Sequence, residues 1–293
     1  MRRWKAIAKA TALEILSEPL SLLVLLAALA LAALAPAFHY HQFGEASRMA
    51  RDAGLSALFT CALAVAVFGT VKSFRRELET GTAEMALSRP VSRTAFLFSK
   101  IAGALAAFAV FSFIVSAETC IIVNGAEIGG MIAAKRGDIA RLWGPSFALG
   151  MAVIVLPLAV GALLNRFFSV RFVPAAFALA AATAAGSLFY RFDAAIVSRL
   201  VPVQILVTAF VSVFLVAAAA FAVRLKANTA VSAVLLLAAL SIPFAGNYYL
   251  SDALSGGGRV PWSYVAGALA ALIPAWAGFG LLAARFFSER DVG

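Results

Sequence analysis

Hydrophobic residues run through this chain in long blocks that are separated by short polar intervals. An α-helix needs about 17–25 predominantly apolar residues to cross the hydrocarbon core of a bilayer. The runs of this length are Leu20–Phe38, Leu55–Val71, Ile101–Val123, Phe147–Leu164, Phe172–Tyr190, Val201–Val223, Thr229–Ala245 and Val265–Ala284. The pattern therefore predicts an all-α integral membrane protein with about eight hydrophobic helices.

The run Thr229–Ala245 gives the weakest of these predictions. It is short and holds Pro243 near its end, so it could be a broken or re-entrant helix. Such a helix is tolerated at membrane depth only where protein or water satisfies its freed backbone groups. Six full spans together with broken or re-entrant helices are the alternative to eight full spans.

The first 18 residues follow a different pattern. One side of a helix would carry, at helical spacing, Trp4, Ile7, Thr11 and Ile15. The lysines and arginines fall on another side, which is typical of a helix that lies in the plane of the lipid headgroups. We expect residues 1–18 to form such an interfacial helix, or at least to set the topology through their positive charges.

The composition excludes an ordinary soluble domain. Hydrophobic residues make up 63% of the chain and charged residues 13%, whereas soluble domains have roughly 45–50% and about 25%. The formal net charge is +10, but the basic residues sit between apolar blocks and form no long run. Membrane orientation explains this charge better than a nucleic-acid partner does.

The distribution of basic residues predicts the orientation. If the amino terminus is cytoplasmic, eight crossings leave 16 of the 24 lysines and arginines in the cytoplasm. Cytoplasmic loops carry an excess of such residues. We therefore expect a multi-pass protein of the bacterial cytoplasmic (inner) membrane with both termini in the cytoplasm.

One long polar interval, residues 72–100, connects the second and third apolar runs. Gly81 can end one helix, Thr80 or Thr82 can cap the next, and Pro90 would stop it. Ser92 can cap a further helix that leads into the third run. These signals predict a short cytoplasmic helix between two membrane helices.

This interval resembles the permease subunits of type-2 ABC exporters. The resemblance rests on a glutamate, a Gly-Thr pair and the pattern LSxPVSRxxFxxxK, which correspond to Glu77, Gly81, Thr82, Leu87, Ser88, Pro90, Val91, Ser92, Arg93, Phe96 and Lys100. The start of the chain, RRWKAIAKATALEILSEPLSLLVLL, is also similar to the family's interfacial helix and first span. The likeness covers about the first 100 residues. Beyond them it is supported only by hydropathy and by the ending FFSERD, which begins at Phe286.

The resemblance implies one permease domain over residues 1–293 in which residues 72–100 form a coupling segment. In that family the short helix docks on a separate ATPase subunit and transmits its movement to the membrane helices. The residues assigned to this ATPase-coupling element or its hinges are Glu77, Gly81, Thr82, Leu87, Pro90, Val91, Arg93 and Lys100. The implied assembly has two ATPase subunits and a second permease copy, with six spans as the usual number.

The chain lacks the residues that would handle ATP or carry out catalysis. It contains no GxxxxGK[ST] phosphate loop, so we expect ATP and Mg²⁺ to be bound by the ATPase subunit and no cofactor by this chain. No Ser/His, paired-Asp or HExxH arrangement can be assembled from its residues. A transport subunit rather than an enzyme is expected.

Two other classes of function remain open at this stage. A membrane scaffold or assembly factor could use the same cytoplasmic helix to bind a partner without moving a substrate. A secondary transporter is the third possibility, although such proteins usually bury several ionisable groups in the membrane, and this chain has hardly one.

A few polar residues in or near the spans are candidates for sites. Glu118 is the only carboxylate well inside a predicted span, and with Gln204 it could line a translocation pathway or bond neighbouring helices. His39 and His41, with Glu45 nearby, make an incomplete metal site, so interfacial anchoring is the default and no metal is expected.

Overall fold

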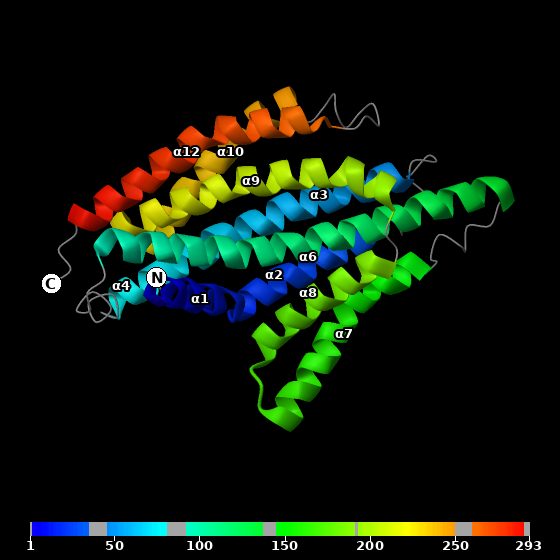
Figure 1. Ribbon diagram of the computed structural model, residues 1–293, viewed down its shortest axis with the longest axis horizontal. Helices are drawn as coiled ribbons and strands as arrows, with labels where there is room; N and C mark the ends of the chain where they lie inside the picture. Colours follow the sequence, from blue (N-terminus) through cyan, green and yellow to red (C-terminus); the bar gives the residue numbers. More distant parts are fainter. Residues whose placement is uncertain are drawn as a thin grey trace. The chain divides into compact units, whose positions relative to one another are not determined.

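The computed structural model describes residues 2–34, 46–80, 92–136, 145–190, 193–249 and 260–289, and these are almost entirely helical (Figure 1). The elements are α1 (Arg2–Leu16), α2 (Pro19–Leu34), α3 (Ala46–Ala64), the π-helix η2 (Val65–Gly69), α4 (Thr70–Glu79), α6 (Arg93–Arg136), α7 (Pro145–Phe168), α8 (Phe172–Tyr190), α9 (Ala194–Arg224), α10 (Ala227–Tyr249) and α12 (Trp262–Glu289). No strand occurs in the described part, and the prediction of an all-α membrane fold is confirmed.

Six helices in the described ranges are long and apolar enough to cross a membrane. Each overlaps a run predicted from hydropathy. They cover Ser47–Glu79, Arg93–Glu127, Ala148–Phe168, Phe172–Phe189, Ala194–Arg224 and Trp262–Glu289. The α6 helix has 44 residues and is therefore about 66 Å long, so it extends well beyond a hydrocarbon core of about 30 Å.

The remaining two predicted runs lie in shorter helices. The first run falls in α2, which is long enough to cross a membrane only if it forms one span together with α1. A break separates the two helices, and Pro19 begins α2 directly after it. The run predicted as weakest falls in α10, where the apolar stretch Ala227–Ser241 is shorter than a span. Six or seven crossings therefore fit the described residues.

The chain folds into two compact units. The first comprises Met1–Ile15, Leu63–Ala109 and Thr208–Gly293, and the second comprises Leu16–Ala62 and Val110–Val207. The prediction of a single permease domain stays a prediction.

In the first unit, α1 packs very closely on α6 and η2. Thr11 and Ile15 form its buried side, in agreement with the periodicity of the sequence. A Cβ built on Gly103 of α6 would lie only 2.3 Å from the carbonyl oxygen of Ala8, and one on Gly69 would lie 3.0 Å from Ile15 Cγ2. Small residues thus allow the backbone of α1 to approach, as is common between membrane helices.

The second half of α9 is the most deeply buried part of the first unit. An alanine-rich stretch has no exposed surface and consists of Ala217, Ala218, Ala219, Ala220 and Ala222. The indole Nε1 of Trp276 donates to Ser212 Oγ at 3.0 Å and links α12 to α9. The α10 helix packs against η2 and α4.

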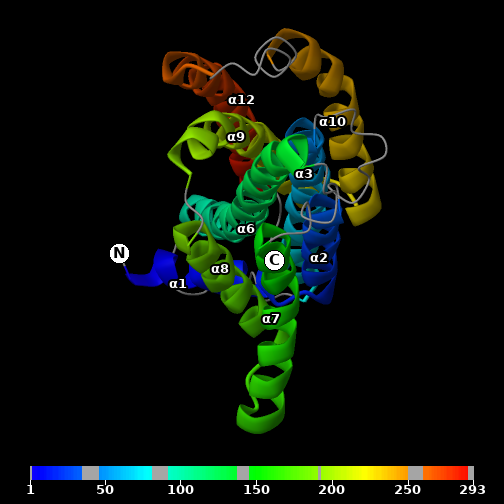
Figure 2. The same ribbon diagram turned by 90° about the vertical axis from the view of Figure 1, so that its right-hand side faces the viewer.

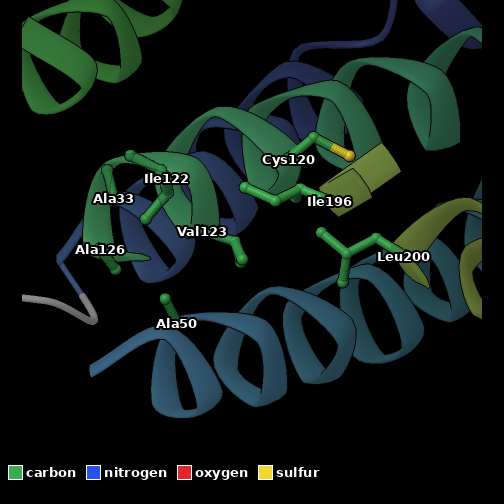
Figure 3. Packing of buried hydrophobic residues seen from close by; sticks show 8 residues of the cluster. All are labelled: Ala33, Ala50, Cys120, Ile122, Val123, Ala126, Ile196 and Leu200. Atoms are coloured by element: carbon green, nitrogen blue, oxygen red, sulfur yellow. The ribbon is translucent and has the colours of Figure 1, made fainter. Parts of the chain in front are cut away.

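In the second unit, α7 and α8 lie side by side as a helical hairpin, and α2 packs against both (Figures 1 and 2). The turn between them is held by Asn165, whose Nδ2 donates to the carbonyl oxygen of Val170 at 2.8 Å. A buried apolar cluster joins α6 to three other helices through Ala33, Ala50, Cys120, Ile122, Val123, Ala126, Ile196 and Leu200 (Figure 3).

Replacing Gly103 by alanine is expected to weaken the docking of α1. The new Cβ would meet the backbone of Ala8, which cannot rotate away, and overpacking of this kind costs about 1–3 kcal/mol. Unfolding of the purified protein by SDS titration would measure the loss. Gly267→Ala on α12 is the matched control, because its Cβ meets nothing within 4 Å and alanine is the better helix former. Equal losses in the two variants would contradict the close contact.

Candidate functional site

The predicted coupling segment is described at its two flanks. Residues 81–91 lie outside the described residues, and with them the predicted site residues Gly81, Thr82, Leu87, Pro90 and Val91. On one flank α4 ends at Glu79, where Thr80 donates its backbone N–H to the carbonyl oxygen of Arg76 at 2.9 Å. On the other flank Ser92 Oγ accepts the N–H of Ala95 at 3.2 Å, so the predicted helix cap at Ser92 is confirmed.

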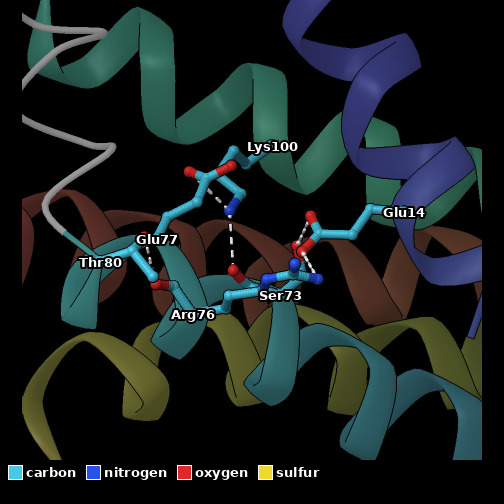
Figure 4. A network of polar contacts seen from close by, with 6 residues as sticks. All are labelled: Glu14, Ser73, Arg76, Glu77, Thr80 and Lys100. Carbon is cyan, nitrogen blue, oxygen red and sulfur yellow. Dashed lines mark hydrogen bonds and ion pairs between the residues drawn. The ribbon is translucent and has the colours of Figure 1, made fainter.

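The flanks are tied together by an ion pair between Glu77 of α4 and Lys100 of α6. Lys100 Nζ lies 2.8 Å from Glu77 Oε2, and the Lys100 side chain is only 1% exposed (Figure 4). The same ammonium donates to the carbonyl oxygen of Ser73 at 3.0 Å and lies 4.8 Å from the ring centre of Phe74. All three groups that contact the Lys100 ammonium belong to α4, so Lys100 holds one face of α4 against α6.

A second contact joins α4 to the amino-terminal helix. Ser73 Oγ donates to Glu14 Oε2 at 2.8 Å, and Arg76 Nη1 lies 3.9 Å from Glu14 Oε1 (Figure 4). Sequence reasoning missed this role of Glu14. The available signal was an acidic residue on a helix whose other charges are basic, but its partner is 59 positions away.

The start of α6 also contacts the end of α12. Arg93 Nη1 donates to the carbonyl oxygen of Ser288 at 3.5 Å, and the rings of Phe96 and Phe287 stack with centres 5.9 Å apart. Within α12, Arg285 Nε donates to Glu289 at 2.8 Å. The sequence indicated Arg93 as part of the site, whereas its contact with the carboxyl-terminal helix was not foreseen.

A further charged contact connects the end of α9 to the same end of α12. Arg224 Nη1 lies 3.5 Å from Glu289 Oε2, and the Arg224 guanidinium lies 5.5 Å from the ring centre of Phe286. The ends of α9 and α12 thus meet beside the start of α6. Because both members of the pair are well exposed, the ion pair itself adds little stability.

Taken together, these contacts form one connected set, which we term the flank network: Glu14, Ser73, Arg76, Glu77, Arg93, Phe96, Lys100, Phe287 and Ser288. It links α1, α4, α6 and α12 within the first unit, and these helix ends lie together at the left in Figure 1. A buried charge pair resists separation, because each charge loses its compensation when the other moves away. A force on residues 81–91 would therefore act on α4 and α6 as a tied pair.

The two candidates for a translocation pathway lie on different sides of α6. Glu118 is fully buried and faces α7, where a Cβ on Gly150 would lie 2.7 Å from Glu118 Oε1. Gln204 of α9 donates from Nε2 to the carbonyl oxygen of Ser116 at 3.1 Å. Its Oε1 accepts a hydrogen bond from Cys120 Sγ at 3.8 Å. Cys120 is two residues from Glu118, which is about 200° around a helix. The structure does not bring the two side chains together.

The candidate metal residues His39 and His41 lie outside the described residues. Among the residues that are described, no group of three or more histidine, cysteine, aspartate or glutamate side chains could hold a metal ion.

Replacing Glu77 by glutamine is expected to destabilise the protein by about 3 kcal/mol, because the buried ammonium of Lys100 loses its counter-charge. SDS-induced unfolding in detergent would measure the change. Glu79→Gln is the matched control: the same chemical change on the same helix removes a surface pair with Arg75, which is worth at most about 0.5 kcal/mol. If the two variants lose equal stability, the ion pair with Lys100 is not what holds α4.

A comparison with known protein families agrees with the fold and with the interval at residues 72–100. The family model described as ABC-2 family transporter protein matches residues 9–185, which is more than half of the chain and runs from α1 into α8. No curated protein and no solved structure matches the chain. The match includes the coupling segment on which the resemblance to type-2 ABC permeases rests. The chain therefore belongs to the ABC-2 family of transporter proteins and is a membrane-spanning permease.

Proposed function

We propose that this permease couples ATP hydrolysis by a separate ATPase subunit to the export of a substrate, and that residues 81–91 are the element on which the ATPase acts. The observation that carries the proposal is that both flanks of this segment enter the flank network. A segment held in this way can pass on a displacement, whereas a loop with free flanks would absorb it.

The ion pair determines how the displacement is passed on. Lys100 is buried against α4, so α4 and the start of α6 move together when residues 81–91 are pushed. Two packed helices that move as one body resemble the lever-like elements of other switching proteins. Through Glu14 and Arg93 the same movement reaches α1 and α12.

The proposed assembly contains two copies of this chain and two ATPase subunits in the bacterial cytoplasmic membrane. A pair of permeases would present two copies of residues 81–91, one to each ATPase, and the ATPases would bind ATP and Mg²⁺. The cytoplasmic location of both termini follows from the excess of basic residues on that side. The flank network supports it, because α1, α12 and the coupling flanks meet at one end of the first unit.

The proposal predicts that the permease purifies with an ATPase subunit and that the flank network is needed for coupling. We expect Glu77→Gln and Thr82→Arg each to reduce permease-stimulated ATP turnover at least about tenfold, because the first loosens the lever and the second places a charge in the docking element. Turnover of the complex in lipid nanodiscs would be measured.

Glu79→Gln serves again as the matched control and should turn over ATP like the unmodified complex. Failure to recover any ATPase subunit would overturn the proposal. Recovery of an ATPase whose turnover is the same with Glu77→Gln, Thr82→Arg and Glu79→Gln would instead favour a scaffold that binds a partner without being driven by it.

A further inference from the structure

The least compensated polar group among the described residues is the carboxyl group of Glu118. The side chain belongs to the span Arg93–Glu127, nine residues before its end, and has no exposed surface. Both carboxyl oxygens are buried and have no hydrogen-bond partner. Acidic residues in membrane spans are rare and usually face a partner, a cavity or a ligand.

The helices around Glu118 carry few charged residues. The α3 helix contains Arg48, Arg51 and Asp52, and Arg51 is paired with Asp52 at 3.2 Å. The α2 and α8 helices of the same unit contain no acidic or basic residue. On α7 the charged residue is Arg166, which lies 16 positions from Gly150, the residue that faces Glu118. The basic residue on this unit's part of α9 is Arg199, which is paired with Glu127 at 3.6 Å.

One close helix contact covers the carboxyl group, and a second is made by the neighbouring residue, Thr119. On α7, a Cβ on Gly150 would meet Glu118 Oε1 at 2.7 Å and Ile122 Cδ1 at 2.6 Å. On α3, a Cβ on Gly54 would meet Thr119 Cγ2, next to Glu118, at 2.3 Å. Glycine at both positions allows the helices to close over a group that has no partner in the closed state.

We propose that Glu118 is the counter-ion for a positively charged group on an apolar transported molecule, reached when α7 separates from α6. A buried carboxylate without a partner is strongly unfavourable in a medium of low polarity. A ligand that carries one positive charge on an apolar body removes this cost. Its apolar part would contact the apolar side chains of Ile122, Met151 and Ile154. The inference rests on the proposed transport function and assigns the substrate class of apolar organic cations.

Binding of tetraphenylphosphonium to the purified permease in phosphatidylcholine nanodiscs tests the proposal. Tetraphenylborate is the probe of equal shape and opposite charge. We expect saturable binding of the cation beyond its uptake by empty nanodiscs, no binding of the anion beyond its own uptake by empty nanodiscs, and at least about a thirtyfold loss of cation affinity in Glu118→Gln, since one partner of a buried charge pair is removed. Glu127→Gln makes the same change on the same helix and should bind like the unmodified protein.

Glu118→Asp keeps the negative charge and should retain more affinity than Glu118→Gln. Equal affinity of Glu118→Gln and the unmodified protein would overturn the proposal, as would absent cation binding or equal binding of the anion. The comparison of the two probes uses the unmodified protein, so it stands even if a variant fails to fold. Because the permease is measured without an ATPase, failure of this inference is distinguishable from failure of the coupling proposal.

Discussion

The buried ammonium group of Lys100 is the constraint on which the packing of α4, α6 and α1 depends. A charge that is 1% exposed must find its compensation in the protein. It finds it in Glu77, the carbonyl oxygen of Ser73 and the face of Phe74, all on α4. The position of α4 on α6 is therefore set by electrostatics rather than by side-chain packing alone. Since Ser73 also bonds Glu14, the place of α1 depends on the same arrangement.

Away from this end, the size of side chains decides how the helices pack. Helices that are apolar on all sides gain little by burying apolar surface, because lipid is as apolar as the partner helix. Close backbone approach is then the main source of specificity. Gly103 under α1 and the buried alanines of α9 provide it in the first unit, and Gly54 and Gly150 provide it around α6 in the second.

The spans and several local features could be predicted from the sequence, because they depend on neighbouring residues. Six of the eight runs predicted from hydropathy lie in helices long enough to span a membrane, and Ser92 caps α6 as expected. On the predicted apolar side of α1, Thr11 and Ile15 are buried, whereas Trp4 is 45% exposed. The contacts of the site could not be predicted in this way. Arg93 meets Ser288 across 195 positions, and a single sequence contains no signal for such pairing. The sequence thus predicts a functional role for the two flanks of residues 81–91, but not the helices to which these flanks are tied.

The polar side chains inside the spans show why Glu118 stands apart. Thr119, Ser212 and Ser241 each donate a hydroxyl to a backbone carbonyl three or four residues earlier in their own helix. Gln204, the longer amide, reaches the carbonyl oxygen of Ser116 on α6. In each case a hydrogen bond to a backbone carbonyl compensates the side chain for the loss of water, so folding alone explains these four residues. A carboxylate has no hydrogen to donate to a backbone carbonyl, so a helix in lipid offers it nothing comparable. Its compensation must come from a hydrogen-bond donor, a proton or an opposite charge, and neither carboxyl oxygen of Glu118 has a hydrogen-bond partner among the described residues.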